Sequence, residues 1–307
     1  MTHMTMESPK NPFLGANDIN NLKSRSRTAV NPEIYYFSGT GNSLAVARDI
    51  AEKINATLTP IPALMNEESI KPESDVIGLV FPVFYATNDC GIPLIMGRFV
   101  EKLEDLGSKY IFAVCTCGYM PGTTIENLGK AIASRGGKLA AGFTLRMAAK
   151  NLSERKQQKM RAKRLKKIEA IGEYVNAKRE GRYETRDLLR KIVLAPLRAL
   201  EKPIFMYRYK KLSNASNLPF KDLIPLADRS FQTNDNCTGC GTCARVCPVN
   251  NIKMIDDKPV WLDHCENCYA CYAWCPKNAV CGDIVSYNDW YRNPEVKLSD
   301  MLRTDVS

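Results

Sequence analysis

Histidine is scarce in this sequence: among 307 residues there are only two, His3 and His264. His3 lies near the N-terminus and His264 precedes a cysteine, so no Ser-His-Asp arrangement is available elsewhere. The sequence also lacks any apolar run near the roughly 18 residues of a membrane-spanning helix. Its first residues lack the apolar core of a secretory signal. We therefore expect a cytoplasmic protein with no transmembrane segment, whose chemistry belongs to cofactors and not to catalytic side chains. Contact with a membrane surface is a minor alternative.

Cysteine, by contrast, is plentiful, with 12 in the chain. Eight of them fall in two copies of one pattern, C-x2-C-x2-C-x3-C-P. Residues 237–248 read CTGCGTCARVCP and residues 265–276 read CENCYACYAWCP. In a chain without an export signal, this spacing indicates metal ligands and not disulfides.

Three cysteines spaced three apart wrap one face of an iron–sulfur cluster, and the fourth cysteine of each run ligates the other cluster. The pattern therefore predicts two [4Fe–4S] clusters. The first cysteine set is Cys237, Cys240, Cys243 and Cys275, and the second cysteine set is Cys265, Cys268, Cys271 and Cys247. Zinc is the alternative, although zinc sites usually pair C-x2-C with a distant second pair. Residues 228–284 resemble the bacterial ferredoxin domain with two clusters.

Residues 32–45 read PEIYYFSGTGNSLA, which predicts a strand, a loop rich in glycine and hydroxyl groups, and a helix. Such a loop binds anions through inward-pointing N–H groups and the helix N-terminus. The loop has no lysine, so it is not a Walker loop, and it lacks the third glycine of the dinucleotide fingerprint. A monophosphate held by neutral donors fits best. The residues predicted to surround it are Ser38, Gly39, Thr40, Gly41, Asn42 and Ser43.

Residues 34–47 resemble the phosphate loop of flavodoxins, which bind flavin mononucleotide (FMN). Strand-like runs at 57–61, 75–81, 110–116 and 138–147 alternate with helical patterns, which predicts a doubly wound parallel sheet of flavodoxin-like α/β class. The flavin then lies beyond the carboxyl ends of the strands. Two loops, FPVFYATNDCG and TCGYMPG, leave those ends and are predicted to cover the flavin ring. Their candidate residues are Phe84, Tyr85, Thr116, Cys117, Gly118 and Tyr119.

A flavodoxin-like half followed by a small α+β ferredoxin half with two clusters resembles the EFR family ferrodoxins, which are fusion proteins of anaerobic microbes. The resemblance covers residues 32–284, although TLRMAAKNL lacks the Met-Pro-Asn-like turn expected after the fifth strand. It implies FMN and two [4Fe–4S] clusters as cofactors. We predict a polar, disordered extension at 1–31, an FMN-binding domain at 32–180, a helical basic connector at 181–227, a ferredoxin domain at 228–284 and a tail at 285–307.

Positive charge is concentrated in one segment: residues 151–211 contain 19 Lys/Arg and 7 Asp/Glu, a net charge of +12 in a chain of +10. Leu165, Ile168, Ile171 and Val175 recur at helical spacing, so a helix with one apolar face and a solvated basic back is expected. The alternatives are a docking face for an acidic ferredoxin or flavodoxin, or a nucleic-acid site. Nucleic acid is disfavoured because no recognised binding motif accompanies the charge.

We interpret the chain as an electron-transfer protein that passes single electrons between two clusters and FMN, and on to a redox partner. The alternative is an FMN-dependent reductase of a small-molecule substrate, fed by its own ferredoxin domain.

Overall fold

The computed structural model describes residues 30–85, 91–118, 120–148, 152–184, 203–285 and 290–303. Residues 31–307 form one compact unit. The predicted N-terminal extension lies outside the described residues except for its last two. Residues 185–202 of the predicted connector lie outside them as well. Within the described ranges, no helix is long and apolar enough to cross a membrane.

The first part of the unit is a six-stranded parallel sheet in the order β2-β1-β3-β4-β5-β6. The strands are β1 (Glu33–Tyr36), β2 (Thr57–Pro60), β3 (Val76–Pro82), β4 (Tyr110–Cys117), β5 (Leu139–Arg146) and β6 (Arg182–Tyr183). All eight residues of β4 are buried, as expected of a parallel strand covered on both faces. The sheet continues past the predicted domain boundary at residue 180, because β6 pairs with β5.

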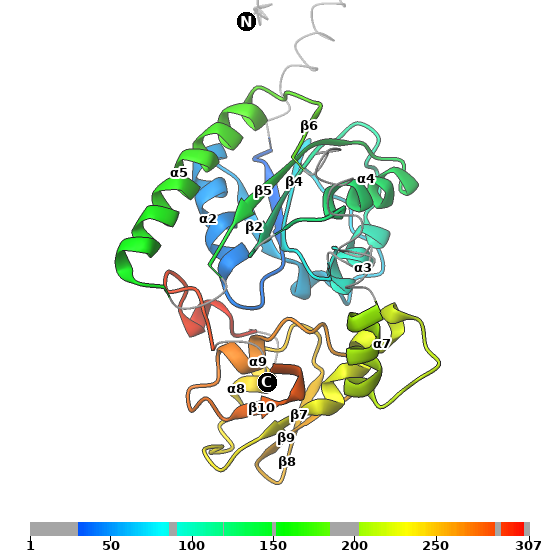
Figure 1. Cartoon of the computed structure of the whole chain (residues 1–307). Coiled ribbons are helices and arrows are strands. Elements are labelled where there is room, and N and C mark those ends of the chain that lie inside the picture. The colour runs from blue at the N-terminus through cyan, green and yellow to red at the C-terminus, as the bar shows by residue number, and fades with distance from the viewer. Residues whose placement is uncertain are drawn as a thin grey trace, which may run out of the picture. The chain divides into compact units, whose positions relative to one another are not determined.

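Helices cover both faces of this sheet (Figure 1). Helices α2 (Asn42–Ile54) and α5 (Glu154–Asn176) lie on one face, and α3 (Leu94–Lys102) and α4 (Thr124–Ser134) lie on the other. The order β2-β1-β3-β4-β5 is that of flavodoxin-like folds, in which the switch point lies between β1 and β3. The predicted fold class is confirmed.

Helix α5 departs in one position from its predicted apolar face. Three of the four predicted residues are buried, namely Ile168, Ile171 and Val175. Leu165 is instead 41% exposed, and its neighbour Arg164 takes the buried position. The Arg164 guanidinium is neutralised there by Asp49 and Glu295, at N–O distances of 3.0 and 2.5 Å. A buried arginine is tolerated because both of its partners are carboxylates.

The second part of the unit has short antiparallel pairs and very short helices. Strand β7 (Phe231–Thr233) pairs with β10 (Val280–Gly282), and β8 (Ile252–Ile255) pairs with β9 (Lys258–Trp261). Helices α8 (Thr242–Arg245) and α9 (Ala270–Ala273) each follow a loop of cysteines. Helix α7 (Phe220–Leu226) and a helix at 203–213 pack against this ferredoxin-type part. Single 3-10 turns lie at Ile61–Leu64, Ala227–Ser230, Asp283–Val285 and Leu298–Asp300.

Glu266, between two cysteines of the second run, joins the two parts. Its buried carboxylate accepts hydrogen bonds from the Ile95 backbone N–H at 2.8 Å and from the Arg98 guanidinium at 2.6 Å. Ile95 is in the first turn of α3, so the carboxylate satisfies an N–H group that the helix leaves unpaired. Burial raises the pKa of Glu266, and Arg98 opposes that rise. The cysteine loop is thus fastened to a helix of the sheet.

Replacing Glu266 by alanine should lower the free energy of unfolding by about 1–3 kcal/mol, because a buried N–H group loses its acceptor. Glu101→Ala, at an exposed position of the same helix, should change it by less than about 0.5 kcal/mol. Thermal denaturation of both variants under anaerobic conditions measures the difference. Equal midpoints would show that the Glu266 contact contributes nothing to holding the parts together.

Candidate cofactor sites

A cavity of about 190 Å³ lies at the carboxyl ends of the parallel strands. Its wall includes the β1–α2 loop and the ends of β3, β4 and β5. The opposite wall comes from the ferredoxin-type part, through Cys268, Tyr269, Tyr272 and Ala273, and from Tyr291 near the C-terminus. Ligands of doubly wound sheets bind at this edge, outside the strand ends.

Five of the six residues predicted to bind a phosphate line this cavity, namely Ser38, Gly39, Thr40, Asn42 and Ser43. The Ser38 hydroxyl oxygen is buried and has no hydrogen-bond partner among the described residues. The Ser43 hydroxyl is 2.8 Å from the hydroxyl of Thr116, which also lines the cavity. A buried hydroxyl without a partner costs free energy, so the position of Ser38 favours a polar ligand.

Gly41, the sixth residue, does not line the cavity. Its φ of 90° lies in the left-handed region, which favours glycine. A Cβ atom at this position would lie 3.1 Å from Cβ of Val296 and 3.2 Å from Cβ of Asn293. The turn and the close approach of the C-terminal segment therefore both favour glycine here.

The residues predicted to cover a flavin ring divide into three groups. Phe84, Thr116, Cys117 and Gly118 line the cavity. Tyr119 lies outside the described residues.

Tyr85 does not line the cavity. With a φ of 53° it points into an aromatic cluster, and its ring centroid is 5.5 Å from those of Tyr209 and Phe220. Burial raises the pKa of Tyr85 well above its ordinary value. The structure thus packs the half-buried Tyr85 among these rings and not against the cavity.

Two tyrosines of the second cysteine run line the cavity, whereas Tyr85 does not. Neither Tyr269 nor Tyr272 was among the predicted site residues. The signal was present in the comparison of the two runs: Gly241 and Ala244 of the first run correspond to Tyr269 and Tyr272 of the second. Bulky aromatic residues at positions that the other copy fills with small ones indicate an additional contact surface.

The eight pattern cysteines surround two separate small cavities. The first cysteine set (Cys237, Cys240, Cys243, Cys275) lines one of them, and the second set (Cys247, Cys265, Cys268, Cys271) lines the other. This grouping matches the predicted ligand sets, and each set includes a cysteine from the opposite run. Among the described residues, no group of three or more His, Cys, Asp or Glu converges as on a single metal ion.

The surroundings of these thiols suit a bound cation. Burial raises the pKa of Cys243 to about 11 and the pKa of Cys265 and Cys271 well above the ordinary value. A free thiolate is therefore costly at these positions, whereas a coordinating metal deprotonates the thiol outright. Backbone N–H groups also donate to the sulfurs of Cys247 and Cys275 at 3.2 Å.

The second cysteine cavity and the strand-end cavity share a wall. Cys268 lines both of them. A Cβ atom on Gly39 would lie 2.0 Å from the Cys268 carbonyl oxygen, so the phosphate loop and the cysteine loop touch backbone to backbone. The indole N–H of the fully buried Trp274 donates to the Gly39 carbonyl at 2.9 Å. The two candidate cofactor sites are therefore adjacent.

The two cysteine sets differ in exposure. In the first set Cys240 is exposed and Cys237 is half-buried, whereas all four cysteines of the second set are buried. A hydrogen bond from the Thr242 hydroxyl lowers the pKa of Cys240. The first set thus reaches the surface, and the second set is buried beside the strand-end cavity.

Comparison with known proteins supports the division of the chain into a sheet part and a ferredoxin-type part. Residues 230–285 match a family model described as a 4Fe-4S dicluster domain. The chain therefore joins a flavodoxin-like fold to a ferredoxin-type domain. A search of the curated proteins found no match.

Solved structures similar to the chain include two flavodoxins. The flavodoxin of Streptococcus pneumonia TIGR4 is 17% identical over 48% of this chain and 98% of its own, with a TM-score of 0.35. Flavodoxin 2 from Bacillus cereus is 18% identical over 47% of this chain and 95% of its own, with a TM-score of 0.35. The strand order described above, and not these scores, establishes the fold.

Replacing Gly39 by alanine should separate the two loops, because the added methyl group would overlap the Cys268 carbonyl oxygen. We expect a loss of about 1–3 kcal/mol in the free energy of unfolding, as for other overpacked sites. Gly97→Ala is the matched control, since a Cβ atom there meets nothing within 4 Å and alanine favours helix α3. Thermal denaturation should rank Gly39→Ala below wild type and Gly97→Ala at or above it. The reverse order would contradict the close approach of the loops.

Proposed function

We propose that the protein transfers electrons between two [4Fe–4S] clusters, held by the eight pattern cysteines, and an FMN in the strand-end cavity. The observation that carries this proposal is that Cys268 lines both the strand-end cavity and the second cysteine cavity, which supports a cluster directly beside the flavin. When bound, the flavin supplies chemistry with one or two electrons, and the clusters supply single electrons. A reducing compartment such as the cytoplasm keeps the thiols available for iron. The resemblance to the EFR family ferrodoxins stays a prediction.

Several features of the cavity support FMN. The buried Ser38 hydroxyl has no partner within the described part of the chain, and the loop leads into the N-terminus of the 13-residue helix α2. A helix N-terminus and neutral donors together bind a phosphate without a lysine or arginine. Phe84 and the second-run tyrosines Tyr269 and Tyr272 provide aromatic surface for a flat ring.

The difference in exposure supports an order for the cofactors. The first cysteine set is the one that reaches the surface, at Cys240. The second set is buried and shares Cys268 with the flavin cavity. In our proposal a redox partner exchanges electrons with the first cluster, and the second cluster relays them to or from the flavin.

Anaerobically purified protein should contain about eight iron atoms and eight acid-labile sulfides per chain, from two four-iron clusters, together with one FMN. Cys275→Ser should remove the surface cluster, because Cys275 belongs to the first cysteine set although it lies in the second run. Electron exchange with an external donor should then fall sharply, while FMN stays bound. Electron paramagnetic resonance and iron analysis measure the loss. Stoichiometric zinc without sulfide would overturn the cluster assignment, and loss of the buried cluster instead would overturn the order.

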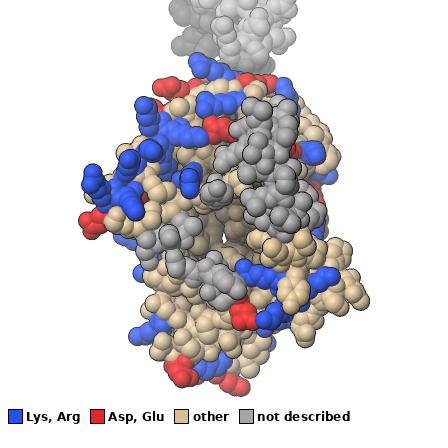
Figure 2. Space-filling view, in the orientation of Figure 1, with Lys and Arg blue, Asp and Glu red and all other residues tan. Residues whose placement is uncertain are grey.

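Helix α5 is the proposed docking surface for a second, acidic partner. Figure 2 shows lysine and arginine side chains gathered over this helix. Arg164 and Lys167 are not available for docking, because Arg164 pairs with Asp49 and Glu295, and Lys167 pairs with Glu184. The exposed lysines of the helix include Lys159, Lys163 and Lys166.

The position of this surface favours contact with the flavin. Met160 and Arg161 of α5 line a smaller cavity that shares Met147, Ala148 and Tyr291 with the strand-end cavity. A protein docked on the first half of α5 would therefore lie beside the flavin site. A carrier of negative charge, such as an acidic ferredoxin or flavodoxin, would be attracted there.

Charge reversal at Lys159 and Lys163 should remove most of the salt dependence of electron transfer to such a carrier. Electrostatic steering raises association rates by about 10–1000-fold at low salt, so stopped-flow rates at low and high ionic strength measure the effect. The matched control is reversal at Lys130 and Lys178, two exposed lysines away from this region. Identical salt dependence in all three proteins would make the basic face of α5 a solvated surface only.

A further inference from the structure

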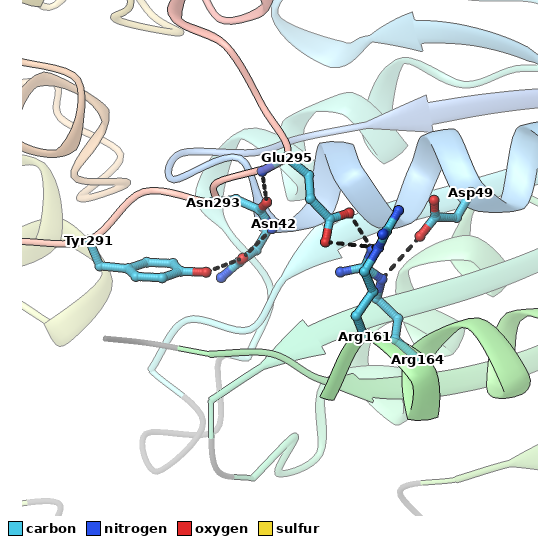
Figure 3. Close-up of polar contacts among 7 residues, drawn as sticks. All are labelled: Asn42, Asp49, Arg161, Arg164, Tyr291, Asn293 and Glu295. Carbon is cyan, nitrogen blue, oxygen red and sulfur yellow. Dashed lines mark hydrogen bonds and ion pairs between the residues drawn. The ribbon is translucent and has the colours of Figure 1, made fainter. Parts of the chain in front are cut away.

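The C-terminal segment at 290–303, which was predicted to belong to a tail, lies against the phosphate loop at 38–43. The Asn293 backbone N–H donates to the Thr40 carbonyl at 2.8 Å. Its side-chain amide donates to Oδ1 of Asn42 at 2.9 Å, and the Tyr291 hydroxyl donates to the same oxygen at 3.0 Å (Figure 3). Tyr291 also lines the strand-end cavity. Residues from the end of the chain are thus part of the loop's immediate surroundings.

Asn42 is the residue on which these contacts converge. It is the first residue of α2 and lines the cavity. Its Nδ2 donates to the Ala148 carbonyl at 2.9 Å, so its amide has three protein partners in all. The preceding residue, Gly41, packs against Asn293 and Val296 so closely that a side chain would not fit without a shift. The segment therefore fixes both the turn and the first side chain of the helix.

An ion-pair network anchors the segment to the sheet part. Both carboxylate oxygens of Glu295 are paired, one with Arg164 at 2.5 Å and the other with Arg161 at 3.4 Å (Figure 3). The Arg164 side chain is 6% exposed and also pairs with Asp49 of α2. The Glu295 backbone N–H donates to Oδ1 of Asn293 at 2.9 Å, which connects the anchor to the residue on the loop.

The two ends of the segment, at Trp290 and Arg303, each contact one cysteine run. The Trp290 indole N–H donates to the Tyr272 carbonyl at 3.2 Å. The Arg303 backbone N–H donates to the Arg245 carbonyl at 3.1 Å, and its guanidinium lies 3.4 Å from the Cys247 carbonyl. One segment therefore spans the phosphate loop and the two runs that hold the clusters.

We propose that Tyr291 and Asn293 are positioning residues of the flavin site, which hold Asn42 and the Thr40–Gly41 turn in the conformation that receives the phosphate of FMN. The loop has no cationic side chain, so its affinity depends on how well its neutral donors are preorganised. Without the two donors to Asn42, the turn and the start of α2 would sample more conformations. Those additional conformations would make fewer contacts with the phosphate. This inference rests on the proposed binding of FMN.

Comparing FMN with riboflavin, which has the same ring but no phosphate, tests the inference on the full chain with its clusters. Each of Tyr291→Phe and Asn293→Ala should weaken FMN binding by roughly 3–10-fold, which is the effect of losing one or two hydrogen bonds. Binding of riboflavin should stay within about 2-fold of wild type, because the phosphate loop does not contact it. Flavin fluorescence titration measures both dissociation constants, and iron content reports on the ferredoxin-type part.

The matched control is Tyr174→Phe, which also removes a hydrogen-bonding tyrosine hydroxyl, in this case one that donates to the backbone carbonyl of Glu180 at 2.7 Å. It should leave both dissociation constants unchanged. Unchanged FMN binding in the Tyr291 and Asn293 variants would overturn the inference. Equal weakening of FMN and riboflavin would overturn it too, since that result indicates general support of the fold. If wild-type protein binds neither flavin, the proposed function itself fails.

Discussion

The structure depends above all on the contact between Gly39 and Cys268, where the phosphate loop and a cysteine loop meet with no side chain between them. Other interactions around it hold this contact in place. The Trp274 indole donates across it, and Glu266 fastens the same cysteine run to the start of α3. Because electron transfer requires cofactors to lie close together, the backbone contact sets how near the two sites can come. The rest of the sheet and of the ferredoxin-type part can be understood as support for that one approach.

Local sequence patterns were sufficient to predict the architecture. Apolar runs such as DVIGLVF and YIFAVCT, separated by helical patterns, led to a parallel sheet because a strand buried on both faces is apolar throughout. The spacing of the eight cysteines led to two sets that exchange one member, and the structure groups them in the same way. The strand, loop and helix at the start of the sheet were equally accessible, since these three elements follow one another directly in the sequence.

Features that depend on partners far away in the sequence could not be predicted from such local patterns. Arg164 is buried in place of Leu165 because Asp49 and Glu295, far away in the sequence, neutralise its charge. Tyr85 turns away from the cavity because Tyr209 and Phe220 offer it an aromatic environment. The role of residues 290–303 depends on contacts with a loop that lies 249 positions away in the case of Tyr291 and Asn42. No periodicity or spacing reports such pairs, and only the contrast between the two cysteine runs hinted at the tyrosines that line the cavity.

The contact of Tyr291 and Asn293 with Asn42 has a consequence for synthesis of the chain. A ribosome adds about 5–20 residues per second. The 249 positions between Asn42 and Tyr291 therefore correspond to a delay of roughly 10–50 s. During that interval the sheet can form while the loop still lacks its last two hydrogen-bond donors. Both cysteine runs are also synthesised before those donors, so all eight pattern cysteines are present in the chain before the loop can be completed.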